Sequence, residues 1–536
     1  MITDRRKQQA IVLALVALTA MLVPAAPTQA QPASRQLNFI ASEFPAPDWP
    51  NQMAMADLNG DGRNDLIVPR WTVGTGRQLL VYLQQSNNRF PAQPSRYIAI
   101  VPEIVAVSFA DIRPEAGEEL LLLTGTGAFS LSSAIDGYSG NIRPLFDWPL
   151  IAAIPDRRVT EFLPPPTDIN NDGHVDLLLP GTDGHGVFLG GPDEQFTLVQ
   201  QFSTVNEDLD PADLPDSAGR FTTQVQFNRQ DGLVVSLQAR PNSAFADFLD
   251  DAHNDDSNLL LERSLWLPPA AFANINRADS SDIVFLNIGD DIRGQINVLT
   301  QHTGQQTGQQ PDQQYNASPD WQGPIDMEGD IYLQEINGDG LTDVMRVTED
   351  GNDWDVYFYL NRGGDFDFDQ PDQVMRFSGY DVQINITDIT GSGDPELGVS
   401  YYTIPVVNAI RNTSIVRTQL LYGNNGEREQ FRFNNRPDFR LEENFSPSNI
   451  RGLSSPIRLD TDLDGDGRID ALYLTDDGTL AARHIDANLQ FASEPFWQYV
   501  PQRTIIAFSV QDLNADDTPD LLLYHSNTIT VLVSSP

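Results

Sequence analysis

The chain contains a nine-residue acidic segment that recurs in six copies, with oxygen-bearing side chains at alternate positions. Two clear copies are DLNGDGRND at 57–65 and DLDGDGRID at 462–470. Each copy is followed by a short apolar run, such as LIV or ALYL, which is typical of a buried strand. Most copies start about 50–74 residues apart. Repetition at this spacing predicts one repeat architecture rather than several unrelated domains.

Side-chain oxygens at positions 1, 3, 5 and 9, with the carbonyl of position 7, can surround one hard cation. Calcium takes six to eight oxygens and tolerates irregular geometry. The strand-like residues that follow, and Val68 in place of a glutamate at position 12, exclude an EF-hand. We therefore predict up to about six calcium ions. The predicted ligands are Asp57, Asn59, Asp61, Arg63, Asp65, Asp168, Asn170, Asp172, His174, Asp176, Glu335, Asn337, Asp339, Leu341, Asp343, Asp388, Thr390, Ser392, Asp394, Glu396, Asp462, Asp464, Asp466, Arg468, Asp470, Asp512, Asn514, Asp516, Thr518 and Asp520.

A polar turn is the alternative for any single copy, because Asn, Asp and Gly are common turn residues. The carboxylate at position 9 of all six copies favours the cation. Two further copies, at 111–119 and 274–282, are degenerate, with Arg113 at position 3 of the first and Ala278 at position 5 of the second. The Arg113 guanidinium could replace a metal among the carboxylates of its own loop. Whether either degenerate loop binds an ion stays open.

These residues resemble the FG-GAP/VCBS repeats of integrin α-subunit propellers and of many bacterial secreted proteins. A second element of that family follows several loops, as in VYLQQSNNRF (81–90), VFLGGPDEQF (187–196) and FYLNRGGDFDF (358–368). The resemblance implies an all-β chain that forms a single β-propeller of four-stranded blades. The eight loops imply eight blades, and seven is the alternative. The calcium loops would join the first two strands of each blade.

We assign residues 31–536 to the propeller. The long interval between the loops at 168 and 274 predicts an insertion at about 200–262, and the segment 224–238 is either part of it or a ninth, worn repeat. A Gln-rich loop is expected at 301–316. The stretch LNFIASEF (37–44) is expected to supply the last strand and close the ring, which leaves only short, protected edges.

Residues 1–30 are typical of a secretory signal peptide, with a basic start, an apolar stretch too short to span a bilayer, and TQA before the cleavage point. We therefore expect a secreted protein that is periplasmic, extracellular or attached to the cell surface, with no membrane span. There is no cysteine, and Lys7 is the one lysine. Disulfides and lysine chemistry are thus excluded from residues 31–536.

The net charge of −42 is the second constraint on function. Six calcium ions would offset only about twelve of these charges. A field of this sign repels nucleic acid and anionic membranes. Salt adaptation explains such an acidic surface, and a cationic partner is the alternative.

The six histidines are not spaced as zinc ligands, and no nucleophile-elbow or metalloprotease motif is present. The function that we predict is a calcium-binding module for adhesion or scaffolding, with a protein or glycan ligand on one propeller face. Two alternatives stay open, a carbohydrate-active lyase or hydrolase, and a structural subunit of a cell-surface assembly. Enzymatic activity is therefore undecided, with binding favoured.

Overall fold

A computed structural model describes residues 37–45, 53–132, 142–150, 160–163, 165–181, 184–203, 270–277, 281–288, 294–302, 315–326, 329–404, 415–445 and 457–535. Four short backbone segments between 220 and 240 are also described. The predicted signal peptide, most of the predicted insertion and most of the Gln-rich loop lie outside these residues. No helix in the described part of the chain is long and apolar enough to cross a membrane.

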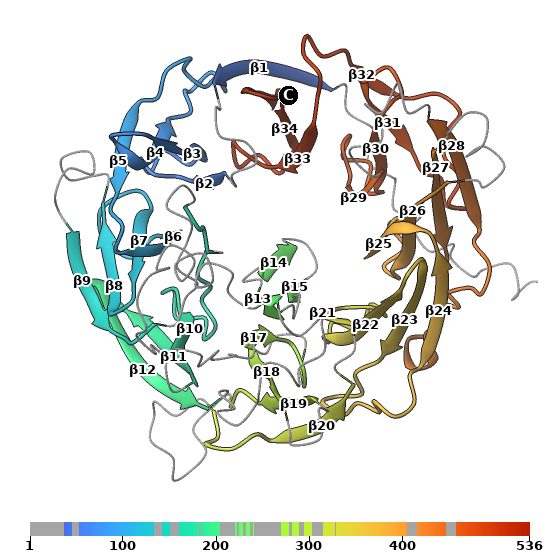
Figure 1. Cartoon of the computed structure of the whole chain (residues 1–536), viewed down its shortest axis with the longest axis horizontal. Helices are drawn as coiled ribbons and strands as arrows, with labels where there is room; N and C mark the ends of the chain where they lie inside the picture. The colour runs from blue at the N-terminus through green and yellow to red at the C-terminus, as the bar shows by residue number, and fades with distance from the viewer. Residues whose placement is uncertain are drawn as a thin grey trace, which may run out of the picture.

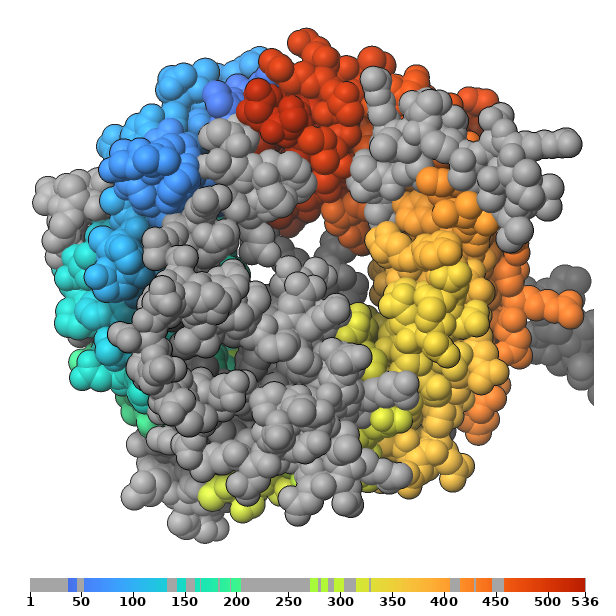
Figure 2. All heavy atoms as spheres, in the orientation of Figure 1, coloured from blue at the N-terminus to red at the C-terminus, as the bar shows by residue number. Residues whose placement is uncertain are grey.

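The chain forms an all-β propeller of eight blades arranged around a central axis (Figure 1). The blades follow one another in sequence order, and they encircle an opening that is visible in Figure 2. This count confirms the prediction of eight blades and excludes seven. Helix is limited, in the described residues, to single 3-10 turns such as η2 (Pro192–Glu194) and η4 (Arg428–Gln430).

Seven blades are antiparallel sheets of four strands, ordered from the axis to the rim. They are β2 (Ala54–Ala56), β3 (Asp65–Thr72), β4 (Gly76–Tyr82), β5 (Arg96–Ile100); β6 (Ile104–Ala110), β7 (Glu119–Thr124), β8 (Gly127–Leu131), β9 (Ile142–Asp147); β17 (Ala270–Ala273), β18 (Asp282–Ile288), β19 (Gly294–Leu299), β20 (Trp321–Ile325); β21 (Asp330–Gln334), β22 (Asp343–Asp350), β23 (Asp353–Tyr359), β24 (Gln373–Ser378); β25 (Tyr380–Thr387), β26 (Glu396–Thr403), β27 (Ile415–Tyr422), β28 (Phe439–Phe445); β29 (Arg458–Thr461), β30 (Asp470–Leu474), β31 (Leu480–His484), β32 (Trp497–Tyr499); and β33 (Ala507–Gln511), β34 (Asp520–Tyr524), β35 (Thr528–Ser535), β1 (Asn38–Pro45).

The third blade differs from the prediction of four strands. Its sheet contains β10 (Leu177–Gly181), β11 (Gly184–Gly191) and β12 (Gln195–Phe202). In place of an inner strand, two isolated antiparallel bridges flank this sheet, Thr167 with Asp176 just before β10 and Leu150 with Gly181 at the end of β10. Phe162, just upstream, forms a parallel bridge with Val107 of the second blade instead. The residues expected to form the inner strand are therefore shared with the neighbouring blade.

The segment between the third and fourth blades forms two small sheets that belong to no blade. One pairs β13 (Arg220–Phe221) with β16 (Ala239–Arg240), and the other pairs β14 (Val225–Asn228) with β15 (Gly232–Val235). The β15 backbone lies against the inner strands β17 and β21. Within the predicted relic at 224–238, β14 and β15 thus form a two-stranded sheet on the inner side of the ring rather than a four-stranded blade (Figure 1).

The N-terminal strand closes the ring. β1 pairs along its whole length with β35, from Asn38 opposite Ser535 to Pro45 opposite Thr528. The rim strand of the last blade is therefore supplied by the start of the propeller, as predicted. Phe44 of β1 is buried and stacks on Tyr82 of the first blade at 4.3 Å between ring centroids, so closure also packs the last blade against the first.

The core lies between neighbouring blades. One cluster combines Leu58, Ile67 and Val81 of the first blade with Val107 and Leu120 of the second. The central strands of each blade pack against a neighbouring blade on both faces. Their sequences are therefore continuous apolar runs and do not alternate between apolar and polar residues. The rim strand β5 has one face open to solvent and alternates exposed and buried residues.

Candidate metal centre

All eight acidic segments occupy the same place in their blades. Each lies before the second strand, and in the seven four-stranded blades it connects the first strand to the second. Position 9 is the first residue of the second strand in seven blades, and in the third blade it is Asp176, the residue before β10. The repeat read from the sequence is therefore a repeat in space, with one loop at the inner end of every blade.

The six copies that keep the full pattern share one backbone conformation. Positions 4 and 6 have positive φ in all six, from Gly60 (70°) and Gly62 (81°) in the first loop to Ala515 (55°) and Asp517 (59°) in the last. Glycine adopts this conformation without strain, which explains its frequency at these positions. The degenerate loop at 111–119 has Pro114 at position 4 and cannot adopt it, because proline fixes φ near −65°.

The position-1 carboxylate organises each loop. Asp57 accepts hydrogen bonds from the N–H groups of Asp61 (3.1 Å) and Gly62 (2.7 Å). Positions 3 and 5 continue the arrangement, since the Asn59 side-chain oxygen accepts from Asp61 N–H and the Asp61 carboxylate accepts from Arg63 N–H. These bonds turn the side-chain oxygens of alternate residues toward the inside of the loop. The equivalent position-1 acceptors are Asp168, Glu335, Asp388, Asp462 and Asp512.

The position-9 carboxylate has a second role that the sequence did not reveal. Buried Asp65 accepts from the N–H of Leu58 at position 2 (3.2 Å) and from the N–H of Gln84 beyond the third strand (2.8 Å). It therefore ties the loop to the turn that follows the third strand of its own blade. Equivalent bonds to position 2 are made by Glu119, Asp176, Asp282, Asp343, Glu396, Asp470 and Asp520.

The position-9 acid is therefore present in all eight blades, including those with degenerate loops. Its conservation within the chain follows from this internal bond as well as from any metal. Burial raises the pKa of Asp65 to about 7, of Asp470 to about 8 and of Asp520 to about 7. Burial likewise raises the pKa of Glu119, in a degenerate loop, to about 6. A bound cation would favour the charged form of these carboxyls.

The donor set in the loops fits a hard cation. In the loop at 462–470, oxygens of Asp462, Asp464 and Asp470 lie within 4.8 Å of one another. Asp464 is 1% exposed, and its Oδ2 atom accepts no hydrogen bond. The Oδ1 atom of Asn514, at the same position of the last loop, is likewise buried without a hydrogen bond. A buried acceptor in this state is costly unless a cation or water contacts it.

Arginine side chains interact with two loops. Arg63 and Arg468 at position 7 pair with the position-5 carboxylates Asp61 and Asp466. An ion competes with these arginines for the same carboxylate.

In the degenerate loop at 111–119, the charge of Arg113 acts on Glu119 of its own loop, where it opposes the rise in the Glu119 pKa that burial causes, and the guanidinium also contacts the neighbouring blade. It donates to the Ser130 hydroxyl at 2.7 Å and lies 3.4 Å from Glu194 of the third blade. Its role is thus to join two blades. The second degenerate loop has Ala278 outside the described residues.

Neighbouring loops are joined to one another. The position-8 N–H donates to a carbonyl at position 1 or 2 of the preceding loop, as in Glu118 to Asp57 (2.8 Å) and Ile469 to Ile389 (3.0 Å). The Asn361 amide of the FYLN element donates to the Ile275 carbonyl of the preceding blade at 2.7 Å. Hydrogen bonds therefore join the loops of neighbouring blades, and the FYLN element that follows the loop contributes one of them.

One further side chain near the loops was missed in the sequence. His484 ends β31 directly opposite Asp470, and its Nδ1 atom lies 3.3 Å from Asp470 Oδ1. The only hint in the sequence is a histidine 14 residues after a position-9 acid. By contrast, His185 is buried and stacks on Phe202, and burial lowers its pKa to about 3.

Comparison with known proteins adds two distant structures. No family model matches the chain, and no curated protein matches its sequence. A lectin of Agrocybe aegerita that recognises non-reducing terminal N-acetylglucosamine is 14% identical, with 73% of this chain and 79% of that chain covered and a TM-score of 0.35. The periplasmic gluconolactonase PpgL of Pseudomonas aeruginosa is 12% identical, with 81% and 95% covered and a TM-score of 0.32. Similarity this low supports no conclusion about ligand or activity.

Proposed function

We propose that the chain is a secreted β-propeller that calcium stabilises and that acts as a binding or scaffolding module. The observation that carries the calcium part is the shared conformation of six loops, each with side-chain oxygens at positions 1, 3, 5 and 9. The buried, unbonded oxygens of Asp464 and Asn514 support it. Export rests on the predicted signal peptide, and calcium outside the cell is abundant enough for sites of moderate affinity.

The propeller has two faces, one that carries the acidic loops and an opposite one that carries the turns between strands 2 and 3. In an antiparallel blade, the turn between strands 1 and 2 and the turn between strands 3 and 4 lie at the same end. The calcium loops are joined to each other at this end. At the opposite end lie the turns between strands 2 and 3, where Val73 is 87% exposed. We place the partner, a protein or a glycan, on this opposite face.

Retention of partners from a panel of immobilised glycans and envelope proteins tests the proposal. We expect retention that is lost when calcium is chelated, because the blades then lose their loop contacts. Val73→Asp, on the proposed binding face, should weaken retention without changing calcium-dependent stability. At moderate calcium, Asp57→Asn should reduce calcium-dependent stability without weakening retention. Calcium-dependent cleavage of an acidic polysaccharide would contradict a binding role and favour the lyase or hydrolase alternative.

A further inference from the structure

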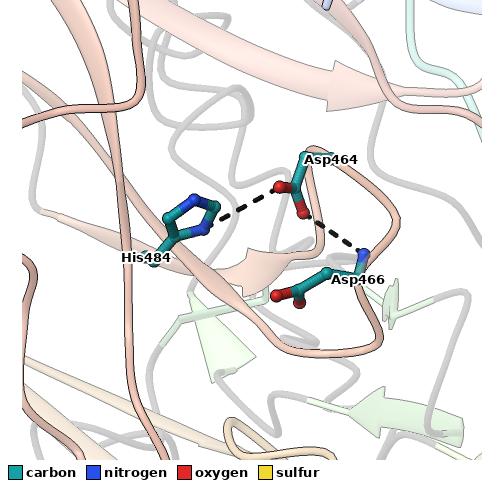
Figure 3. Close-up of side chains that lie close together, drawn as sticks. All are labelled: Asp464, Asp466 and His484. Atoms are coloured by element: carbon teal, nitrogen blue, oxygen red, sulfur yellow. Dashed lines mark hydrogen bonds and ion pairs between the residues drawn. The ribbon is translucent and has the colours of Figure 1, made fainter. Parts of the chain in front are cut away.

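The seventh blade carries a group of side chains that is found at no other loop in the described part of the chain. Asp464, Asp466 and His484 offer ligand atoms that all lie within 4.8 Å of one another, and Figure 3 shows the imidazole directed at the Asp464 carboxylate. The His484 Nδ1 atom lies 3.9 Å from Asp464 Oδ2 and 3.3 Å from Asp470 Oδ1. This is the one place in the described residues where an imidazole joins such a cluster.

Two substitutions make this loop different from the other five. Position 3 is an aspartate here, whereas four other loops have asparagine and one has threonine. The residue opposite position 9 is His484, whereas continuing the strand register by one residue places Leu83, Leu189 and Leu360 there in other blades. One change adds a carboxylate and the other adds a nitrogen donor, so both alter the ligand set at the same point.

The Asp464 carboxylate is an acceptor that lacks a hydrogen bond at one oxygen. Asp464 is 1% exposed, and its Oδ1 accepts from Asp466 N–H at 3.2 Å. Its Oδ2 accepts no hydrogen bond and lies 3.9 Å from the Nδ1 atom of His484. The imidazole ring stacks on Phe496 at 4.0 Å with an interplanar angle of 6°, which fixes the direction of Nδ1. His484 keeps 36% of its side chain exposed, so an ion can reach the cluster from solvent.

We propose that Asp464, Asp466 and His484 bind a divalent first-row transition metal ion rather than calcium. Calcium selects oxygen ligands, whereas imidazole nitrogen suits Zn²⁺, Co²⁺ and their neighbours in the series. Ligand bonds of about 2.0–2.2 Å place donor atoms up to about 4.3 Å apart, close to the spacing in this cluster. Asp464 also belongs to the calcium group with Asp462 and Asp470, so the two ions compete at this blade. The inference rests on the loop geometry used for the proposed function, but not on calcium binding elsewhere.

A Co²⁺ titration of the full chain tests the proposal, because visible absorption reports nitrogen and oxygen coordination directly. With calcium in excess, we expect one Co²⁺ per chain, and His484→Ala should weaken its binding by more than about tenfold. His174→Ala is the matched control, since His174 occupies position 7 of another loop and should leave Co²⁺ binding unchanged. The double variant Asp464→Asn/His484→Leu restores the residues of the other loops and should bind calcium there but not Co²⁺.

The outcomes separate this inference from the calcium proposal. Equal Co²⁺ binding by the parent and His484→Ala, or displacement of Co²⁺ by millimolar calcium, overturns the transition-metal site and leaves the other loops untouched. Co²⁺ binding that depends on His484 supports the transition-metal site. If the melting temperature of the same protein does not change with calcium, the calcium proposal is contradicted while this site stands. Circular dichroism of each variant shows whether the blades are still folded.

Discussion

The backbone N–H of Glu118 donates a hydrogen bond of 2.8 Å to the backbone carbonyl of Asp57, which joins the loop of the second blade directly to that of the first. Similar bonds join other neighbours around the ring. An ion that orders one loop therefore also orders part of the next. We expect calcium to bind with coupling between adjacent loops rather than to independent sites.

Alanine substitutions at two glycines of one loop can distinguish the contact between loops from backbone strain within the loop. Gly391 and Gly393 both have positive φ, but a Cβ at Gly391 would lie 2.2 Å from the Gly467 carbonyl of the next loop, whereas a Cβ at Gly393 meets nothing within 4 Å. Gly393→Ala should cost about 1–2 kcal/mol of stability. Gly391→Ala should cost about 1–3 kcal/mol more, because the two loops must move apart. Urea unfolding measures both, and equal costs would exclude an energetic role for the contact between loops.

The position-9 acid should stabilise a blade whether or not its loop binds calcium. In a degenerate loop, Asp282 accepts from the N–H groups of Ile275, Asn276 and Gln301 at 2.7–3.1 Å. Asp282→Ala leaves these donors without an acceptor and should cost about 3 kcal/mol or more, equally in calcium and in chelator. Asp343→Ala is the comparison, since it should also reduce the stabilisation by calcium. If chelation changes the effect of Asp282→Ala, the role of this acid is not purely structural.

The raised pKa values of the position-9 acids predict an unusual dependence of stability on pH. Burial raises the pKa of Asp65 and Asp520 to about 7 in the folded chain, above the value in the unfolded chain. At pH values between the unfolded-state pKa and the folded-state pKa, the folded chain binds more protons than the unfolded chain. In chelator, the free energy of unfolding should therefore fall as pH rises from 5 to 8. Each such group contributes at most about 1.4 kcal/mol per pH unit.

Calcium should reverse this trend, because it binds the charged carboxyls and releases their protons. Calorimetry at pH 6.5 in two buffers of different ionisation enthalpy measures the protons released on calcium binding. Asp65→Asn should release fewer protons than the parent chain. Calcium binding without proton release would show that these carboxyls are already charged in the folded protein.

Ring closure depends on Phe44. This side chain of β1 is 1% exposed and stacks on Tyr82 of the first blade. Phe44→Ala should cost about 3–5 kcal/mol, because it leaves a cavity between the first and last blades. Val73→Ala, at a side chain that is 87% exposed, is the control and should cost almost nothing. Chemical denaturation compares the two, and equal stabilities would mean that β1 contributes little to closure.

The blade count and the position of every loop could be predicted because they depend on local sequence that repeats. The partners of the position-9 acids could not. Asp65 finds Gln84, 19 residues away, only through the register of β3 and β4. His484 and Asp470 meet through the same kind of register in the seventh blade. The three-stranded sheet of the third blade arises because Phe162 bridges to Val107 of the preceding blade, which no local pattern indicates.

Thermal unfolding with a parallel count of bound calcium tests the central claim most directly. The full chain is dialysed against calcium or chelator, its metal content is measured, and its melting temperature is recorded in both states. We predict several bound calcium ions per chain and a clearly higher melting temperature with calcium, since each site at 100 times its Kd adds about 2.7 kcal/mol. A chain that retains no calcium and melts at the same temperature in both states would contradict the account.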